Sequence, residues 1–363
     1  MVASRLGTWV AREYEVVAEI PDLMPTGVTV ADSGRVFVSI PRWGDDVPYT
    51  VAEVVDGKLV AFPNVDVNRW SPQRAADTLV SVQSVIIDPA GSLWLLDTGS
   101  LAFAPSVEAG PKLVQVDLET GQVVRIVRPS AEAMTPTTYL NDVRFDLSRG
   151  DAGYAYLTDS QAEGALVVVD LASGESWSRL RGHRSTHAEE GFRAVVQGVV
   201  REGYAVGADG IALGADGERL YFCPLSSRRL YSIDTAALRD RELSEAEIAA
   251  RVVDHGDKGS SDGLESDTDG AIYATAYEHS AVLKLAANGT WTTILHAPAL
   301  LWPDTLSLAA DGYLYVSINQ LPRTPLFNNG VDDRIPPYQI VRVPVHAHPV
   351  RLGPAAAQPT PAE

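Results

Sequence analysis

The sequence predicts an all-β protein, a single six-bladed β-propeller with four-stranded antiparallel blades and a short helical insertion. Six segments repeat one template: an apolar alternating run, a Gly-containing turn, and a second strand rich in aromatic and β-branched residues. Alternation with period two is typical of strands, and Asp-Gly or Ser-Gly between two such runs is typical of hairpins. Such a repeat, about 40–60 residues long with about four strands, is the pattern of a propeller blade.

The inner strands of the six blades are expected to begin near residues 26, 83, 141, 209, 262 and 304. Strand candidates between the repeats, such as 112–127 and 164–180, supply the outer strands of their blades. The candidate at 8–20 is expected to pair with 340–345 in the last blade, because that pairing closes the ring and removes an exposed edge. The best helix signal, 243–252, begins with a Ser-Glu-x-Glu run that resembles a helix cap, so we expect a short insertion in blade four.

One closed propeller absorbs the whole length of 363 residues. We therefore expect residues 1–350 to form a single propeller domain, with inner strands at the positions given above. The Pro- and Ala-rich segment 351–363 is expected to be a disordered C-terminal tail.

The composition restricts the partners of the chain. A formal net charge of −18 argues against nucleic acid and against anionic membranes, since both attract basic surfaces. No apolar run reaches the about 18 residues that a membrane span needs, and the single cysteine, Cys223, excludes an intramolecular disulfide. The first residues lack the apolar core of a signal peptide, so we expect a cytoplasmic monomer that binds a small molecule, with secretion of a trimmed precursor as the alternative.

A propeller brings the heads of its inner strands together at one mouth of the central channel. The polar residues at those heads are Thr26, Gln83, Ser84, Asn141, Asp142, Asp209, Asp262, Asp304 and Thr305. The loops expected to frame the mouth are 41–46, 97–100, 158–164, 223–229, 277–280 and 319–323. A long polar loop with His183 and His187 lies between blades three and four and is a candidate lid.

The acidic run at 261–276 divides between two faces of this fold. Asp262 is expected at the mouth, Glu265 is expected to point into the channel by alternation, and Asp267 and Asp269 are expected in a tight turn on the far face. The spacing of the acids excludes a calcium loop of the EF-hand type.

Several carboxylates in one cleft repel each other, which raises some of their pKa values or requires a cation. Three interpretations stay open: a divalent ion such as calcium held by Asn141, Asp209 and Asp262, functional use of the acids without metal or other cofactor, and acids neutralised by water and local hydrogen bonds. The predicted catalytic residues are Asp142, Asp209, Asp262 and Asp304, with Glu278 and His279 as a reserve acid–base pair. The predicted substrate-binding residues are Thr26, Arg42, Trp43, Gln83, Asn141, Asp159, Cys223, Tyr277, Trp302 and Asn319.

Five segments resemble the Yellow / major royal jelly protein family: 27–43, 139–146, 156–177, 220–240 and 302–319. The resemblance implies a six-bladed propeller, and the Ala- and Asp-rich composition suggests a bacterial member. In that family, insect members include dopachrome-converting enzymes, nutritive proteins and salivary proteins that bind biogenic amines in the channel.

The inner-strand motifs are also similar, more distantly, to the gluconolactonase/regucalcin propellers, which hold a divalent ion with a Glu, two Asn and an Asp. By motif position, Asn141 matches one Asn and Asp262 matches the Asp. Asp209 stands where an Asn is usual, and Thr26 stands where the Glu is usual, which weakens the inference of a metal-dependent lactonase.

Three functions compete. The first is a small-molecule enzyme at the channel mouth, which isomerises, tautomerises or cyclises an aromatic or quinone-like metabolite of bacterial specialised metabolism by proton transfer. The second is divalent-metal-dependent hydrolysis of a lactone or ester. The third is binding of cationic amines without catalysis, which the net charge favours. A propeller that binds other proteins is a weaker fourth.

Overall fold

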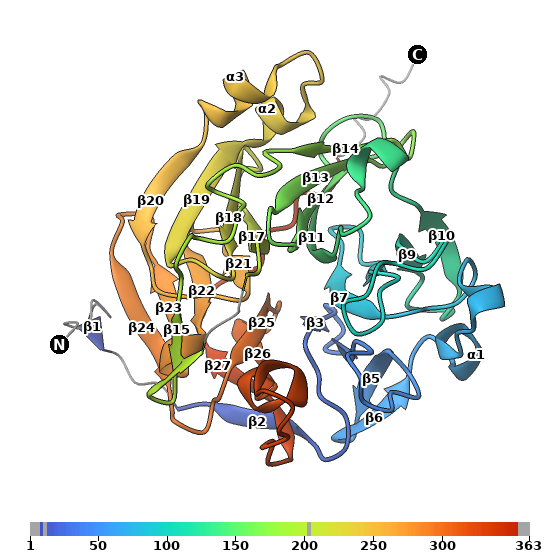
Figure 1. Cartoon of the computed structure of the whole chain (residues 1–363), viewed down its shortest axis with the longest axis vertical. Coiled ribbons are helices and arrows are strands. Elements are labelled where there is room, and N and C mark those ends of the chain that lie inside the picture. Colours follow the sequence, from blue (N-terminus) through green and yellow to red (C-terminus); the bar gives the residue numbers. More distant parts are fainter. Residues whose placement is uncertain (1–7, 10–12, 202–204, 355–363) are drawn as a thin grey trace, which may run out of the picture.

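The computed structural model describes residues 8–9, 13–201 and 205–354, and it confirms the predicted six-bladed β-propeller with four-stranded antiparallel blades (Figure 1). Blades one and two are β3 (Val28–Val30), β4 (Val36–Ser39), β5 (Val51–Val55), β6 (Lys58–Ala61), and β7 (Val82–Ile87), β8 (Leu93–Asp97), β9 (Lys112–Val116), β10 (Val123–Val127). Blades three and four are β11 (Leu140–Asp146), β12 (Tyr154–Asp159), β13 (Ala165–Asp170), β14 (Ser176–Arg179), and β17 (Ala208–Leu213), β18 (Arg219–Pro224), β19 (Arg229–Asp234), β20 (Val253–Asp257). Blade five is β21 (Leu264–Ser266), β22 (Ile272–Ala276), β23 (Ala281–Leu285), β24 (Trp291–His296), and blade six is β25 (Pro303–Leu308), β26 (Tyr313–Ile318), β27 (Tyr338–Pro344), β2 (Glu15–Ile20).

The last blade closes the ring with strands from both ends of the chain. β2 pairs antiparallel with β27, with Val16 opposite Val341, as the sequence predicts. The strand expected over 8–20 is divided, however, because β1 (Thr8–Trp9) pairs in parallel with β24 of blade five, and residues 10–12 lie outside the described residues. The N-terminal segment therefore covers the outer edges of two blades rather than one.

Four of the inner strands carry a register shift at their heads, in blades two, three, four and six. A bulge leaves residues unpaired and turns the strand locally, which re-aims side chains. The shifted residues include Gln83, Asn141, Asp209 and Asp304. The bulges thus explain how residues from fully buried strands can face the channel mouth.

Hydroxyl hydrogen bonds and close contacts at glycines hold the start of each inner strand against the neighbouring blade. The Ser39 hydroxyl donates to the carbonyl oxygen of Gln83 (2.7 Å), and the Thr158 hydroxyl does the same to Asp209 (2.7 Å). A Cβ added at Gly210 would lie 2.3 Å from the carbonyl oxygen of Asp262, and one at Gly263 would lie 2.5 Å from that of Asp304. The glycine in these repeats is therefore required by close approach of the neighbouring inner strand.

The helical insertion lies in blade four, as predicted. α3 (Glu245–Ala249) begins with a capping box between Ser244 and Glu247, and it follows α2 (Thr235–Arg239), which the sequence did not indicate. A further one-turn helix, α1 (Val65–Asn68), connects blades one and two. Within the described ranges, no helix is long and apolar enough to span a membrane.

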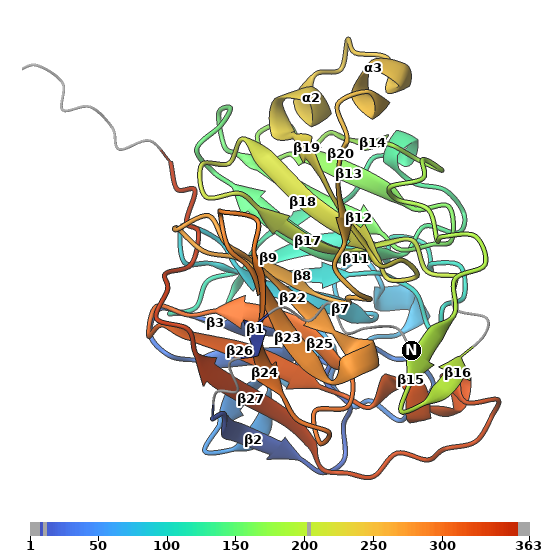
Figure 2. The same cartoon turned by 90° about the vertical axis from the view of Figure 1, so that its left-hand side faces the viewer.

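The two faces of the ring are closed differently. On the mouth face, the loop between blades three and four forms a hairpin, β15 (Ala194–Val196) and β16 (Val199–Arg201). On the far face, the chain after β27 crosses the ring, and the backbone N–H of Leu147 donates to the carbonyl oxygen of Leu352 (2.8 Å) (Figure 2). Residues 351–354, expected in the tail, are thus part of the fold, whereas 355–363 lie outside the described residues.

Candidate active site at the channel mouth

The six strand heads meet at the mouth, one from each blade. They are Thr26, Gln83, Asn141, Asp209, Asp262 and Asp304, and each is at most 9% exposed. Adjacent heads touch: the Asn141 amide Nδ2 donates to Asp209 Oδ1 (2.6 Å), and the Thr26 hydroxyl donates to the carbonyl oxygen of Gln83 (3.4 Å). The structure therefore brings together the residues that the repeat placed far apart in sequence.

The acids on the mouth form a cluster of three. Burial raises the pKa of Asp209 well above its usual range, and the charges of Asp262 and Asp304 raise it further. Burial likewise raises the pKa of Asp304 well above its usual range, with the charge of Asp262 as the second cause. Burial raises the pKa of Asp262 to about 6. Three carboxylates buried in one cleft do not all ionise readily near neutral pH.

The buried carboxyl groups of Asp209 and Asp262 interact, and this interaction raises the pKa of Asp209 and lowers that of Asp262. Two ionised carboxylates buried side by side repel each other, so the pair favours a state in which one of the two carries a proton. The two opposite directions favour the protonated form of Asp209 and the ionised form of Asp262. The pair titrates as a coupled unit, with an ionised Asp262 beside a protonated Asp209 above pH 6.

Two side chains behind the cluster orient the acids. Trp302 Nε1 donates to Asp262 Oδ2 (2.7 Å), and the Asn319 amide donates to Asp304 Oδ2 (2.5 Å). Trp302 is fully buried, stacks on Tyr277 with 4.0 Å between ring centroids, and has a left-handed backbone (φ 59°). The Tyr277 hydroxyl donates to the carbonyl oxygen of Leu225 (2.8 Å). Tyr277 and Trp302 were predicted as ligand walls, but they lie behind Asp262 and hold it in place.

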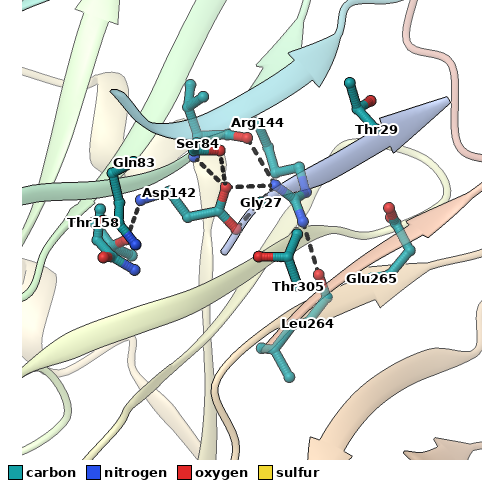
Figure 3. A network of polar contacts seen from close by, with 12 residues as sticks. Gly27, Thr29, Gln83, Ser84, Asp142, Arg144, Thr158, Leu264, Glu265 and Thr305 are labelled. Carbon is teal, nitrogen blue, oxygen red and sulfur yellow. Dashed lines mark hydrogen bonds and ion pairs between the residues drawn. The ribbon is translucent and has the colours of Figure 1, made fainter. Parts of the chain in front are cut away.

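Asp142 lies one layer deeper and is fully engaged (Figure 3). The Ser84 hydroxyl donates to it (2.7 Å), and Arg144 Nη1 lies 3.0 Å from both of its oxygens. Arg144 Nη2 donates to the carbonyl oxygen of Leu264 (2.7 Å), so the guanidinium crosses from blade three to blade five. Asp142 and Arg144 form an ion pair beneath the acids, and we call the Arg144 side chain, which connects blades three and five, the crossbar.

Glu265 faces the channel on the far side of the crossbar, as alternation predicts. Burial raises its pKa, and the charge of Arg144 opposes the rise. Glu265 and Arg144 line a small cavity of about 40 Å³ that the C-terminal residues Val350 and Arg351 cover. Asp267, in contrast, accepts hydrogen bonds from two backbone N–H groups of its turn, which agrees with its expected role in the far-face hairpin.

The aromatic side of the mouth is built around Phe103, which carries no signal in the sequence pattern and was not predicted. Its ring stacks on Trp43 (5.1 Å between centroids) and on Tyr139 (5.0 Å). Trp43 Nε1 donates to the Tyr139 hydroxyl (2.8 Å), which donates to Gln83 Oε1 (2.9 Å). Burial raises the pKa of Tyr139, so this hydroxyl stays protonated. Trp43 and Gln83, both predicted to bind substrate, thus belong to one chain of contacts.

Two further predicted binding residues hold loops. Arg42 donates to backbone carbonyl oxygens, among them Val80 O (2.5 Å) and Asn68 O (3.0 Å). Asp159 is fully buried and accepts from the Thr138 hydroxyl (2.9 Å) and from Arg181 Nη1 (3.0 Å). Their polar groups are occupied by the protein itself, so we assign both to the framework of the mouth.

Glu278 and His279, the predicted reserve acid–base pair, have different surroundings. Glu278 Oε1 accepts from Arg228 (2.6 Å) and from the backbone N–H of Val195 in β15 (2.7 Å), whereas His279 is exposed. Glu278 Oε2 accepts from the Ser260 hydroxyl (2.6 Å). Glu278 therefore anchors the β15–β16 hairpin over the mouth.

Cys223 is fully buried, and burial raises the pKa of its thiol. The neighbouring Lys258 opposes this rise, and burial lowers the pKa of Lys258 itself. Lys258 also donates to the carbonyl oxygen of Gly259 (3.0 Å). A high thiol pKa makes Cys223 a poor nucleophile.

The three residues predicted as metal ligands each use one polar atom in a contact within the protein. A hard divalent ion needs several free oxygen ligands. Here the Asn141 amide donates to Asp209 Oδ1, and the Trp302 indole donates to Asp262 Oδ2. Among the residues with described positions, no group of three His, Cys, Asp or Glu side chains is placed to hold a metal.

Comparison with known proteins agrees with the resemblance seen in the sequence. The profile described as Major royal jelly protein matches residues 80–349. Protein yellow of Drosophila yakuba and that of Drosophila melanogaster are each 30% identical to this chain over 237 residues. Each match covers 61% of this chain and 43% of the relative, so this chain spans less than half of the relatives' length.

Solved structures share the fold over nearly the whole chain. A luciferin-regenerating enzyme has a TM-score of 0.59 and 12% identity, covering 94% of this chain and 100% of that one. A calcium-binding protein, regucalcin from Agrobacterium tumefaciens, has a TM-score of 0.57 and 14% identity, covering 97% and 100%. A gluconolactonase-like protein reaches 0.57 with 13% identity, covering 95% and 96%. At these identities the likeness concerns the fold alone.

Proposed function

This chain belongs to the major royal jelly protein family, and on that premise we propose that its channel mouth is the active site of a small-molecule enzyme. The proposed reaction is a proton transfer without a cofactor: isomerisation, tautomerisation or cyclisation of an aromatic or quinone-like metabolite. We place it in bacterial specialised metabolism. The observation that carries the proposal is the buried pair of Asp209 and Asp262, whose interaction raises the pKa of Asp209 and lowers that of Asp262.

The pair offers a base and an acid side by side. Above pH 6 the Asp262 carboxylate removes a proton from a carbon next to a substrate carbonyl, and protonated Asp209 donates its proton to the carbonyl oxygen. The resulting enol returns its hydroxyl proton to Asp209 and takes a proton on another carbon from Asp262. Both carboxyl groups end as they began, so the reaction needs no oxidant, reductant or metal.

The surrounding residues keep the two carboxyls in different states. Trp302 donates to Asp262 and favours its ionised form, whereas Asp304 raises the pKa of Asp209 through its charge. Asp142, held by Arg144, raises the pKa of both Asp262 and Asp304. When the surroundings of two neighbouring carboxyls push their pKa values apart, one can act as the acid and the other as the base.

Deuterium exchange tests this reaction without knowledge of the natural substrate. Acetophenones, chromanones and 1-tetralones are incubated with the protein in D₂O, and NMR follows loss of the proton next to the carbonyl. We expect catalysed exchange in the wild type, and a rate at least about 100-fold lower in Asp262→Asn and Asp209→Asn.

Asp269→Asn is the matched control, because Asp269 lies exposed in the far-face turn. It should exchange at the wild-type rate. Full exchange in both mouth variants would remove the proposal.

Binding of a cationic amine is the second candidate, and the acid cluster with the neighbouring aromatic side chains favours it. Calorimetry with biogenic amines separates the two functions. Tight, salt-sensitive amine binding without any deuterium exchange would favour the binder. Divalent-metal-dependent hydrolysis of a lactone or ester is the third candidate, and elemental analysis of the purified protein for a bound divalent ion tests it.

A further inference from the structure

The six strand heads divide the channel mouth into an uncharged half and an acidic half. The inner strands contact one another around the ring in chain order, from β3 through β7, β11, β17 and β21 to β25 and back to β3. Their heads are uncharged in blades one to three and are Asp209, Asp262 and Asp304 in blades four to six. Opposite positions in a ring of six are three blades apart, so Gln83 of blade two lies across the mouth from Asp262.

A relay of hydrogen bonds orients the side-chain amide of Gln83. The Trp43 indole N–H, which can only donate, donates to the Tyr139 hydroxyl (2.8 Å), and this hydroxyl donates to Gln83 Oε1 (2.9 Å). The indole thus sets the direction of the relay, and the Gln83 oxygen faces Tyr139. The amide nitrogen, Nε2, is left at the other corner of the planar group.

Gln83 Nε2 is an accessible donor without an acceptor. None of the described residues accepts a hydrogen bond from it, whereas the nitrogen of the neighbouring amide, Asn141 Nδ2, donates to Asp209. Nε2 does not belong to the solvent-sealed side-chain atoms that lack a partner, so it keeps accessible surface although Gln83 is only 7% exposed. A register shift of β7 at this residue turns it toward the channel, so the free N–H is available to a ligand there.

The charges at the mouth restrict what this N–H can bind. It needs an acceptor lone pair, which a protonated amine does not have. A carboxylate or phosphate would be repelled by the acids, whose charges reach the Gln83 side of the mouth: burial raises the pKa of Tyr139, and the charges of Asp209 and Asp304 add to the rise. An uncharged carbonyl oxygen meets both conditions.

We propose that Gln83 selects the substrate by donating from Nε2 to a second carbonyl oxygen, so that the substrate is an uncharged dicarbonyl compound. One oxygen accepts from Asp209 on the acidic side, and the other accepts from Gln83 on the opposite side. A ligand that covers the mouth without a second oxygen would strip water from Nε2 and leave it unpaired. This inference rests on the proposed function, because it assigns the substrate class of the same site.

Cyclohexane-1,4-dione and cyclohexanone are matched probes, because they share one ring and differ in the second oxygen. NMR in D₂O at pH 7 follows exchange of the protons next to the carbonyl, and the ratio of the two kcat/KM values gives the preference for the dione. Gln83→Met keeps the length of the side chain without its N–H, and it should lower this ratio about tenfold, mainly through the KM of the dione. Unchanged exchange of cyclohexanone in this variant would show that the fold and the acids are intact.

Two further variants complete the test. Tyr139→Phe removes the hydroxyl that orients the amide but leaves the Gln83 N–H in place, so the ratio should fall less, about threefold. Gln122→Met, on the exposed outer hairpin of blade two, is the matched control and should keep the wild-type ratio.

The outcomes separate the role of Gln83 from the proposed function. The same ratio in the wild type and in Gln83→Met, with cyclohexanone still exchanged, would overturn the role of Gln83 and leave the proton transfer standing. Absence of exchange of both probes by the wild type would overturn the proton transfer, and calorimetry with the dione then tests Gln83 alone. Binding weakened about tenfold in Gln83→Met would support its role, whereas equal or absent binding in both proteins would overturn it.

Discussion

The indole Nε1 of Trp302 donates a hydrogen bond of 2.7 Å to Oδ2 of Asp262. The donor comes from the segment just before β25, and the acceptor heads the inner strand of blade five. Trp302 is held by its stack on Tyr277 in a backbone conformation that favours glycine. A strained backbone persists only where the surrounding structure holds it. Here the strained conformation of Trp302 positions the indole N–H that binds Asp262 Oδ2.

Removing this donor should raise the proton affinity of Asp262. Trp302→Phe keeps an aromatic ring but loses the N–H that favours the ionised carboxylate. A hydrogen bond to a charged group is worth about 1.5–3 kcal/mol, so the pKa of Asp262, about 6 in the wild type, should rise by at least about 1 pH unit. The measurement is a ¹³C NMR titration of the aspartate carboxyls.

Tyr277→Phe is the control for Trp302→Phe, because it keeps the stack and removes only the hydroxyl that donates to Leu225. Its Asp262 carboxyl should titrate as in the wild type. An unchanged midpoint in Trp302→Phe would show that the indole N–H does not stabilise the carboxylate.

Stability should fall as pH rises through the titration of Asp262. The folded-state pKa is raised from the ordinary 3.8 to about 6, so the folded protein binds this proton more tightly than the unfolded chain. The contribution of Asp262 is fully present below pH 3.8 and is lost as pH rises to 6, about 3 kcal/mol in all.

Asp262→Asn removes this titration, so its unfolding free energy should lose less than that of the wild type between pH 4 and 8. Urea unfolding across this range gives the difference, which includes the effect of the Asp262 charge on the titration of Asp209 and Asp304. Parallel curves for the two proteins would contradict the raised pKa.

The effects of substituting Arg144 and Asp142 on stability should be coupled, because the two residues form a buried ion pair. Arg144→Met leaves Asp142 charged and buried without its partner, which should cost about 3–5 kcal/mol of unfolding free energy. Adding Asp142→Asn to Arg144→Met removes the stranded charge and should restore most of that loss. Urea denaturation of the two single variants and the double variant measures the coupling, and strictly additive losses would contradict it.

The repeat predicted both the fold and the position of the acids, for a physical reason. The heads of the inner strands recur because each blade needs a bulge or a glycine where the next blade approaches, as at Gly210 and Gly263. That constraint is written in the sequence as Asp-Gly before an apolar run. The repeat alone is therefore sufficient to place Asp209 and Asp262 at one mouth of the channel.

Other parts of the site have no such local signal. Phe103 lies in an irregular loop with positive φ and meets Trp43 and Tyr139 only through the closure of the ring. Arg144 lies in a buried strand. Its polar side chain is accommodated there because it pairs with Asp142 and donates to the carbonyl oxygen of Leu264, two blades away. The burial of Trp302 behind Asp262 likewise depends on packing between blades five and six, which periodicity does not specify.

The central claim is that Asp209 and Asp262 share one proton. Neutron diffraction from crystals equilibrated in D₂O at pH 7 locates that atom directly. A deuterium on Asp209 in the hydrogen bond to Asp262, with no deuterium on the other carboxyl oxygens of the pair, is the predicted result. Two fully ionised carboxylates separated by water or bridged by a cation would contradict the claim.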